Sequence, residues 1–258
     1  MKKELLIMIP AYNEEESIEI VLNKIHRAGI NEIADILVIN DGSKDNTEKV
    51  VRSFNVNIIN QVCNLGYGSA LQVGYKYADK EEYKYVIQLD ADGQHDICNI
   101  KTIYDCLMDK DLNSYEVPDI VIGSRFLKDS VTFKISKIKY FAISLFRLVI
   151  KIITKNDITD PTSGLQGLNR RAFKYYAGYG NFDYMYPDIN MIIQMIMKGY
   201  KIKEIPAVMY ERKTGEAMHS GIIKPIKYMV LITLSTLSII LRNRKNSYVI
   251  NKEREIEQ

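Results

Sequence analysis

The sequence predicts an α/β fold in which helices cover both faces of a mostly parallel sheet. Short apolar runs recur along the first half of the chain, as strands that are buried on both faces require. Segments with apolar residues at helical spacing separate these runs, so a crossover helix joins each strand to the next. Polar residues follow the runs, at the edge where open α/β sheets bind ligands.

The elements of the first half alternate regularly. Residues 5–9 are an apolar strand that ends at Pro10, and residues 18–25 carry apolar side chains at helical spacing before Gly29, which can close that helix. A second strand is predicted at residues 36–39. The remaining elements expected in this half are a helix at about 45–54, a strand near 56–59, a helix at 69–78 and a strand at 85–89.

The second half has fewer clear elements. A strand is predicted at residues 120–122, where Gly123 follows. A helix is predicted at residues 189–197, closed by Gly199. The last strand predicted lies at residues 201–205 and ends at Pro206.

Two stretches are amphipathic or strongly apolar. Residues 135–153 interleave apolar and basic side chains, which is typical of a helix on an anionic membrane surface; the alternative is a helix packed on the core with a solvated cationic face. Residues 222–241 are apolar, and basic residues follow them. We therefore expect a catalytic domain over residues 1–220, a membrane-interface helix over residues 221–245 and a disordered polar tail over residues 246–258.

The composition is that of a folded protein with one large domain, or one domain and an appendage, because 47% of its 258 residues are hydrophobic. A net charge of +3 argues against a general polyanion binder, and no nucleic-acid partner is expected. Residues 125–155 hold eight basic residues and one acid (8 − 1 = +7), which predicts a local basic surface. Three cysteines without metal-ligand spacing, no signal peptide and no apolar run of roughly 20 residues favour a cytoplasmic protein without a membrane span.

One strand ends in two carboxylates. The sequence Asp90-Ala91-Asp92-Gly93-Gln94 directly follows the strand predicted at residues 85–89. Two neighbouring carboxylates suit Mg²⁺ or Mn²⁺, which bind oxygen ligands and are often shared with substrate phosphates. A solvated acidic turn is the alternative for so short a motif.

Polar clusters at the other strand ends favour the ligand site. They are Pro10-Ala11-Tyr12-Asn13-Glu14, Asn40-Asp41-Gly42-Ser43 and Asn64-Leu65-Gly66-Tyr67-Gly68. Because parallel strands end at one edge of a sheet, these clusters are expected to meet the carboxylate pair there. A tyrosine with nearby carboxylates can bind a nucleobase and a ribose, and a cation between the carboxylates and a diphosphate would offset their repulsion.

Together these motifs resemble those of the family 2 glycosyltransferases with the Rossmann-like GT-A fold, and within them the dolichyl- or polyprenyl-phosphate sugar transferases. The further matching motifs are Gly123-Ser124-Arg125, Asp160-Pro161-Thr162-Ser163-Gly164, and Arg212 with Gly215. The motifs run in family order over roughly residues 4–220. The chain departs from the pattern after the Ser-Gly pair, where Leu165-Gln166 replaces the usual aromatic residue and arginine on the acceptor side.

The resemblance implies a role for each matching residue. The nucleotide-sugar would be bound by Pro10, Tyr12, Asn13, Glu14, Asp41, Gly66, Asp90, Ala91 and Asp92. Asp90, Asp92 and Gln94 would hold Mg²⁺ or Mn²⁺. The catalytic set would be Asp160, Arg125 and Arg212, with the arginines on phosphates and Asp160 as a carboxylate on the acceptor side. Asp160 also fits a turn or N-cap residue before Pro161.

The function expected from this resemblance is inverting transfer of a sugar from a UDP- or GDP-sugar to a polyprenyl phosphate, by a metal-dependent enzyme bound peripherally to the cytoplasmic face of the membrane. A membrane-protein partner or a second copy of the chain is a further expected partner. One alternative is a family 2 transferase that acts on a saccharide acceptor in cell-wall or capsule synthesis. The other is a non-catalytic regulator that binds a nucleotide-sugar, which the carboxylate set together with Asp160 argues against.

Overall fold

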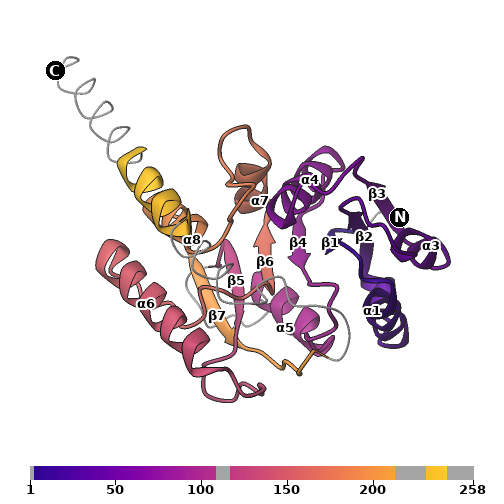
Figure 1. Ribbon diagram of the computed structural model, residues 1–258, viewed down its shortest axis with the longest axis horizontal. Coiled ribbons are helices and arrows are strands. Elements are labelled where there is room, and N and C mark those ends of the chain that lie inside the picture. The colour runs from indigo at the N-terminus through magenta and orange to yellow at the C-terminus, as the bar shows by residue number, and fades with distance from the viewer. Residues whose placement is uncertain (1–2, 109–116, 213–230, 243–258) are drawn as a thin grey trace.

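A computed structural model describes residues 3–108, 117–212 and 231–242 of the chain (Figure 1). Within these residues, seven strands form one sheet in the order β3-β2-β1-β4-β6-β5-β7. The strands are β1 (Leu5–Ala11), β2 (Ala34–Asn40), β3 (Asn57–Asn60), β4 (Tyr85–Gln88), β5 (Ile120–Ser124), β6 (Gln166–Asn169) and β7 (Ile202–Pro206). Only β6 runs antiparallel to its neighbours β4 and β5, so the mostly parallel sheet is confirmed.

Helices cover both faces of this sheet (Figure 1). They are α1 (Glu15–Arg27), α2 (Ile30–Ile33), α3 (Thr47–Arg52), α4 (Tyr67–Lys80), α5 (Cys98–Leu107), α6 (Lys137–Thr154), α7 (Arg170–Ala177) and α8 (Ile189–Met197), with a further helix over residues 231–242. Alternate residues of β1 divide between two cores, because successive side chains of a strand point to opposite faces. Leu6 and Met8 join the core with α4, α7 and α8, whereas Leu5 and Ile7 join the core with α1 and α5.

The strands and helices predicted within the described residues are present, and four further elements, α2, α5, β6 and α7, were not predicted. The strand β6 has the sequence Gln-Gly-Leu-Asn, which lacks an apolar run because the strand is short and its Gly167 lies against Ile103 of α5. The helices α5 and α7 carry many polar or aromatic side chains; Asn169 caps α7 through its side chain, whereas α5 has Ile97 at its N-cap and no side-chain cap. The α/β class therefore followed from the first half of the chain. In the second half β5 and β7 were predicted, and the structure added β6 between β4 and β5.

The helix α6 combines features of both predicted alternatives. Its residues Ile143, Phe146 and Ile150 are buried in the core, so it is a packed helix. A second row of apolar side chains on the same helix remains exposed, including Ile138 and Phe141. Among the described residues, no helix is both long and apolar enough to cross a bilayer. The predicted polar tail at residues 246–258 and most of the predicted helix at 221–245 lie outside the described residues, apart from residues 231–242.

Candidate active site

The ends of β1, β2 and β4 bring three of the predicted clusters together. Because β1 pairs in parallel with β2, Ala11 lies opposite Asn40, and the backbone N–H of Asp41 donates to the carbonyl of Ala11 at 2.9 Å. On the other side of β1, the N–H of Leu89 donates to the carbonyl of Met8 at 3.1 Å. The Pro10, Asp41 and Asp90 segments therefore leave the sheet at the same edge, as predicted from the parallel topology.

The loop after β1 presents Tyr12 at this edge. The side-chain carbonyl of Asn13 accepts a hydrogen bond from the N–H of Lys44 at 2.8 Å, and the N–H of Asn13 donates to Ser43 Oγ at 3.0 Å. Asn13 has a φ of 53°, a left-handed conformation that asparagine tolerates better than most residues. Pro10 is buried, whereas Tyr12 is 40% exposed and its ring is accessible to a ligand.

Asp41 organises the loop that leads into α4. Its buried carboxylate accepts hydrogen bonds of 2.8 Å from the side chain of Gln61 and from the backbone N–H groups of Leu65 and Gly66. Gly66 has a φ of 95° and is the N-cap of α4. Asp41 therefore fixes the position of Gly66, and both lie in the predicted nucleotide-sugar set.

A hydrogen-bonded network surrounds the first carboxylate after β4. Tyr67 Oη donates to Asp90 Oδ1 at 2.9 Å, and His95 Nε2 lies 3.3 Å from Asp90 Oδ2. Burial would raise the pKa of Asp90, but the contacts with His95 and Tyr67 and the charge of Arg125 bring it below its usual value. Asp90 is therefore an anion held in place by neutral and cationic neighbours.

The pKa of the second carboxylate, Asp92, is raised, whereas that of Asp90 is lowered. Burial, and then the negative charge of Asp90, raise the pKa of Asp92, although the N–H of Gln94 donates to its Oδ1 at 3.0 Å. The Gln94 side chain donates to the carbonyl of Tyr210 at 3.2 Å, so it is engaged with the protein. Ala91, between the two carboxylates, is buried and contributes its backbone alone.

This like-charged pair fits a divalent cation that is shared with a substrate. In residues 3–108, 117–212 and 231–242, no group of three or more His, Cys, Asp or Glu side chains is placed to hold a metal ion. Two carboxylates are nevertheless sufficient for Mg²⁺ or Mn²⁺ when the other ligands come from substrate phosphates and water. The raised pKa of Asp92 supports this fit, because a cation would remove the repulsion between Asp92 and Asp90.

Gly164 explains how the loop before β6 approaches these carboxylates. A Cβ atom at this position would lie 2.3 Å from Asp90 Oδ2, which no packed structure permits. Gln88 holds the same loop, since its side-chain amide donates to the carbonyl of Gly164 at 2.8 Å and to Tyr67 Oη at 2.7 Å. The Ser-Gly pair of the predicted motif is thus needed for close backbone approach.

Arg125 and Asp160 form a buried ion pair. Arg125 Nε and Nη2 each donate to one oxygen of Asp160 at 2.7 Å, and the backbone N–H of Arg125 donates to Asp160 Oδ2 at 3.0 Å. The side chain of Asp160 is fully buried, and Arg125 Nη2 also donates to Thr162 Oγ1 at 2.8 Å. The two predicted catalytic residues are therefore brought together, with Asp160 orienting the guanidinium and not facing solvent.

A small pocket of about 120 Å³ lies beside Asp90 and is lined by Arg125, Thr162 and Lys139. Lys139 comes from α6, more than a dozen residues beyond Arg125 in the chain. Burial and the charge of Arg125 lower the pKa of Lys139. Two cationic side chains and a hydroxyl group around one pocket are the chemistry that binds a phosphate group. The sequence marked Lys139 only as part of a basic helix.

Asp188 is a second residue that the sequence did not reveal. It is the N-cap of α8, yet its side chain makes no capping hydrogen bond. Burial, and then repulsion by Asp90, raise the pKa of Asp188 to about 7. An aspartate directly before an apolar helix is normally interpreted as an N-cap, so nothing in the sequence indicated that this carboxyl group lies near the site.

Arg212 reaches the site from the end of the segment that follows β7. Its Nη2 donates to Glu14 Oε1 at 2.6 Å, and Ser17 Oγ contacts the other oxygen of Glu14. Thus Glu14 and Arg212, predicted for the nucleoside and for a phosphate, pair with each other. Gly215, which the matching motif includes, lies outside the described residues.

Sequence and structure comparisons agree over most of the chain. The family model described as "Glycosyl transferase family 2" matches residues 6–176. An undecaprenyl-phosphate mannosyltransferase of Micrococcus luteus is 27% identical, over 84% of this chain and 87% of the relative. A dolichyl-phosphate beta-glucosyltransferase (ALG5A) of Trichomonas vaginalis is 27% identical, over 89% of this chain and 73% of the relative.

The fold has close structural counterparts as well. Glucosyl-3-phosphoglycerate synthase from Mycobacterium tuberculosis, in complex with Mn²⁺, UDP-glucose and phosphoglyceric acid, superposes with a TM-score of 0.64. The match covers 92% of this chain and 79% of that protein at 16% sequence identity. This likeness confirms the GT-A fold that the motifs predicted.

Proposed function

The chain belongs to glycosyl transferase family 2 and is a glycosyltransferase, and from this premise we propose that it transfers a sugar from a UDP- or GDP-sugar to the phosphate of a polyprenyl lipid. The observation that carries this proposal is the pocket beside Asp90, where Arg125 and Lys139 converge with Thr162. A cationic pocket next to the carboxylate pair suits an acceptor that is itself a phosphate. The two relatives compared above are, by name, transferases to undecaprenyl phosphate and dolichyl phosphate.

The donor would bind along the edge formed by β1, β2 and β4. The exposed ring of Tyr12 would stack on the nucleobase, and Asn13, Glu14 and Asp41 would offer acceptor oxygens for the base or the ribose. Pro10, Gly66 and Ala91 shape the backbone around it. Asp90 and Asp92, with Gln94 next to them, would hold Mg²⁺ or Mn²⁺, which when bound offsets the charge that develops on the departing nucleoside diphosphate.

The catalytic residues would act by electrostatics and positioning. Arg125, held by Asp160, would bind the acceptor phosphate and stabilise the charge in transit. A phosphate monoester is already largely ionised near neutral pH, so this acceptor needs no strong base to attack the sugar with inversion. Arg212 would leave Glu14 for the donor diphosphate, and Asp160 would be a positioning residue.

The proposed location follows from the acceptor. A polyprenyl lipid stays in the bilayer, so the enzyme would work as a peripheral protein at the cytoplasmic face of the membrane. Residues 1–220 would form the catalytic domain, and the segment around residues 231–242 would lie at the membrane interface. The basic residues between Arg125 and Lys155 would attract the enzyme to anionic lipids.

The deciding experiment measures transfer of a radiolabelled sugar from a panel of UDP- and GDP-sugars into organic-extractable polyprenyl phosphate, with Mg²⁺ or Mn²⁺. We expect one donor to label the lipid and Asp92→Asn to reduce the rate by about 100-fold or more, because a lost charge contact in the transition state costs on the order of 3 kcal/mol. The control is Asp157→Asn, an exposed carboxylate paired with Lys151, which should leave the rate unchanged. Label that stays aqueous with every donor would sink the proposal.

A second measurement addresses the acceptor pocket. Lys139→Ala should raise the KM for polyprenyl phosphate by about tenfold while leaving the KM for the donor unchanged, and Lys139→Arg should restore most of the loss. An equal rise of both KM values would assign Lys139 to general folding instead of acceptor binding.

A saccharide acceptor is the second candidate, and Asp188 favours it. A hydroxyl acceptor needs a general base, and a carboxyl group with a pKa of about 7 is suited to that role. If label enters a saccharide and not the lipid, and if Asp188→Asn abolishes that transfer, this function replaces the first. A non-catalytic regulator would bind nucleotide-sugars without turnover of any donor.

A further inference from the structure

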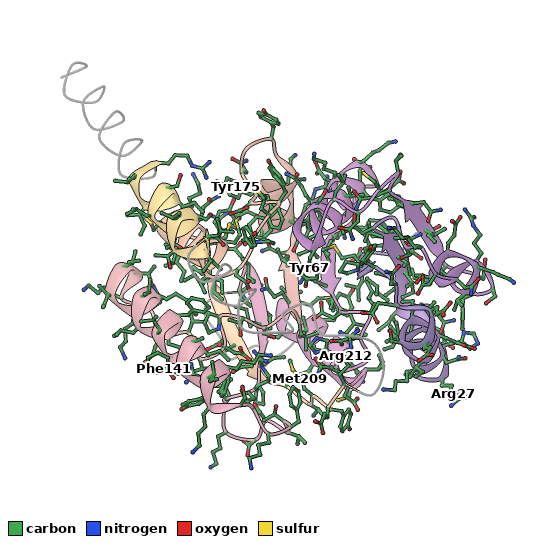
Figure 2. All side chains as sticks on the ribbon, viewed as in Figure 1. Arg27, Tyr67, Phe141, Tyr175, Met209 and Arg212 are labelled. Atoms are coloured by element: carbon green, nitrogen blue, oxygen red, sulfur yellow. The ribbon has the colours of Figure 1, made fainter. Side chains whose placement is uncertain are left out.

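The outer side of α6 carries an apolar row that the rest of the described protein does not cover. Its members are Ile138, Phe141, Leu145, Leu148 and Ile152, which recur every three or four residues. Ile138 is 83% and Phe141 72% exposed, whereas Ile143, Phe146 and Ile150 of the same helix are buried. Figure 2 places the label of Phe141 at the outer edge of the molecule, on α6. Such contiguous exposure is uncommon in a soluble monomer and indicates an interaction surface.

The helix over residues 231–242 carries a second exposed apolar row. Its residues Leu234, Leu237 and Leu241 are more than half exposed and recur at helical spacing, while Ile232 is fully buried. Ile232 belongs to the same core cluster as Phe146 and Ile150, so both helices pack on the same face of the sheet. Figure 1 shows α6 and this helix on the same flank of the molecule. We call the exposed rows of the two helices the apolar flank.

The charged residues of α6 are all basic, and the acidic Asp157 beyond its end pairs with Lys151. The helix α6 contains Lys137, Lys139, Arg147 and Lys151 and no acidic residue. Lys137 and Lys151 are exposed, and Lys155 follows the helix end. An apolar face bordered by lysines matches the chemistry of an anionic bilayer surface, in which apolar side chains enter the acyl boundary and ammonium groups meet the headgroups.

We propose that the apolar flank is a membrane-docking surface, seated in the interface of a bilayer that contains anionic lipids. This inference deepens the proposed function and rests on it for the choice of a bilayer as the occupant. A second copy of the chain is a poorer occupant, because a two-fold pairing of α6 would set its lysines against the lysines of the other copy. A bilayer instead supplies negative charge along the whole flank.

The proposal also explains where the acceptor enters. Lys139 lines the pocket beside Asp90, and its neighbour Ile138 belongs to the apolar flank. One turn of α6 thus faces both the pocket and the lipid. A polyprenyl phosphate held in the docked bilayer would reach Lys139 and Arg125 with its phosphate while its chain stays among the acyl chains.

The test measures binding to vesicles that contain no polyprenyl phosphate, so it does not depend on catalysis. We expect the full chain to bind phosphatidylglycerol-containing vesicles at least tenfold more tightly than pure phosphatidylcholine vesicles. The double variant Phe141→Glu/Leu148→Glu should lose at least tenfold of this binding, because it puts charges at the centre of the flank. The matched control is Ile20→Glu/Ile33→Glu, which changes two exposed apolar residues elsewhere on the surface and should bind normally.

Thermal unfolding of both double variants verifies that they fold. Unchanged vesicle binding by Phe141→Glu/Leu148→Glu would overturn the proposal. So would sedimentation that shows a dimer for the wild type and for the control variant but a monomer for Phe141→Glu/Leu148→Glu. Transfer to a short-chain, water-soluble prenyl phosphate separates the two ideas. If the variant keeps that transfer and loses transfer to acceptor in vesicles, docking is supported; if transfer occurs but vesicles are not bound, docking fails and the proposed function stands.

Discussion

Asp160 contributes to the site through Arg125, because its buried carboxylate orients the guanidinium and does not itself face solvent. Arg125 donates three hydrogen bonds to Asp160, and its guanidinium fork matches the two oxygens of the buried carboxylate. Such an arrangement orients the guanidinium toward the pocket and prevents it from adopting other rotamers. The arrangement buries a charged guanidinium, and Asp160 is the carboxylate that balances its charge.

Replacement of Asp160 by Asn should therefore destabilise the fold. Because it leaves a buried guanidinium unpaired, we expect the free energy of unfolding in urea to fall by about 3–5 kcal/mol. Asp157→Asn removes the exposed pair with Lys151 and should change it by less than about 1 kcal/mol. Similar small losses in the two variants would contradict the buried-pair interpretation.

Asp188 should make stability depend on pH. Its pKa is about 7 in the folded protein, and an unfolded aspartate has a pKa of about 4. Between these values the unfolded chain releases the proton while the folded chain keeps it, so the native state loses stability as the pH rises. We expect the melting temperature of the wild type, relative to Asp188→Asn, to fall from about pH 4 to pH 7 and then level off. A difference that is constant with pH would refute the assignment.

At the scale of elements, the site depends on how loops approach the strand ends. The loop before β6 passes so close to Asp90 that only a glycine fits at position 164, and Gln88 of β4 holds its carbonyl. The antiparallel course of β6 returns this loop to the edge where β1, β2 and β4 end. The acceptor-side motif therefore meets the carboxylate pair through sheet topology.

Gly164→Ala tests this close approach. The added methyl group must push the Asp90 carboxylate away from Tyr67 and His95, so we expect transfer to fall by about tenfold or more and the Mn²⁺ concentration at half-maximal rate to rise. Gly180→Ala is the control: Gly180 has a φ of 69° but open space around it. It should lose about 1 kcal/mol of stability and keep its activity. Equal activity of the two variants would argue against the role of Gly164.

At the scale of the whole molecule, the pair of Glu14 and Arg212 joins the beginning of the domain to its end. The segment after β7 runs back across the site, where the N–H of Tyr210 donates to the carbonyl of Gln94 at 2.7 Å. Arg212 then contacts Glu14 after β1. The proposed donor site is thus bordered by a contact between residues that are 198 positions apart.

A double-mutant cycle should detect this contact. Without ligand, Glu14→Gln and Arg212→Gln should show a coupling energy of about 1–2 kcal/mol in urea unfolding, since the pair is a charge-assisted and partly buried hydrogen bond. With a nucleotide-sugar and Mn²⁺ present, the coupling should decrease, because the diphosphate competes with Glu14 for the guanidinium. Coupling that ligand leaves unchanged would show that Arg212 does not move to the donor.

Much of the architecture was accessible from local sequence patterns. These patterns involve residues that are close together in the chain. They are the apolar runs, the helical spacing of apolar residues, and the glycines Gly29 and Gly199 at helix ends, and they located most strands and helices. The exceptions were the four-residue helix α2, and α5, β6 and α7, whose side chains mix polar, aromatic and apolar types. Their positions are stabilised by packing on other elements, which local periodicity does not record.

The sequence by itself determined the α/β class, the family and the polar clusters at the strand ends, because parallel strands place their carboxyl ends at one edge whatever the details of packing. Only the tertiary structure decided which of these groups meet. It paired Asp160 with Arg125, placed Lys139 at the pocket and put Asp188 near Asp90. Those relations join segments that are far apart in the chain, and their burial sets the charges and pKa values that no local pattern encodes.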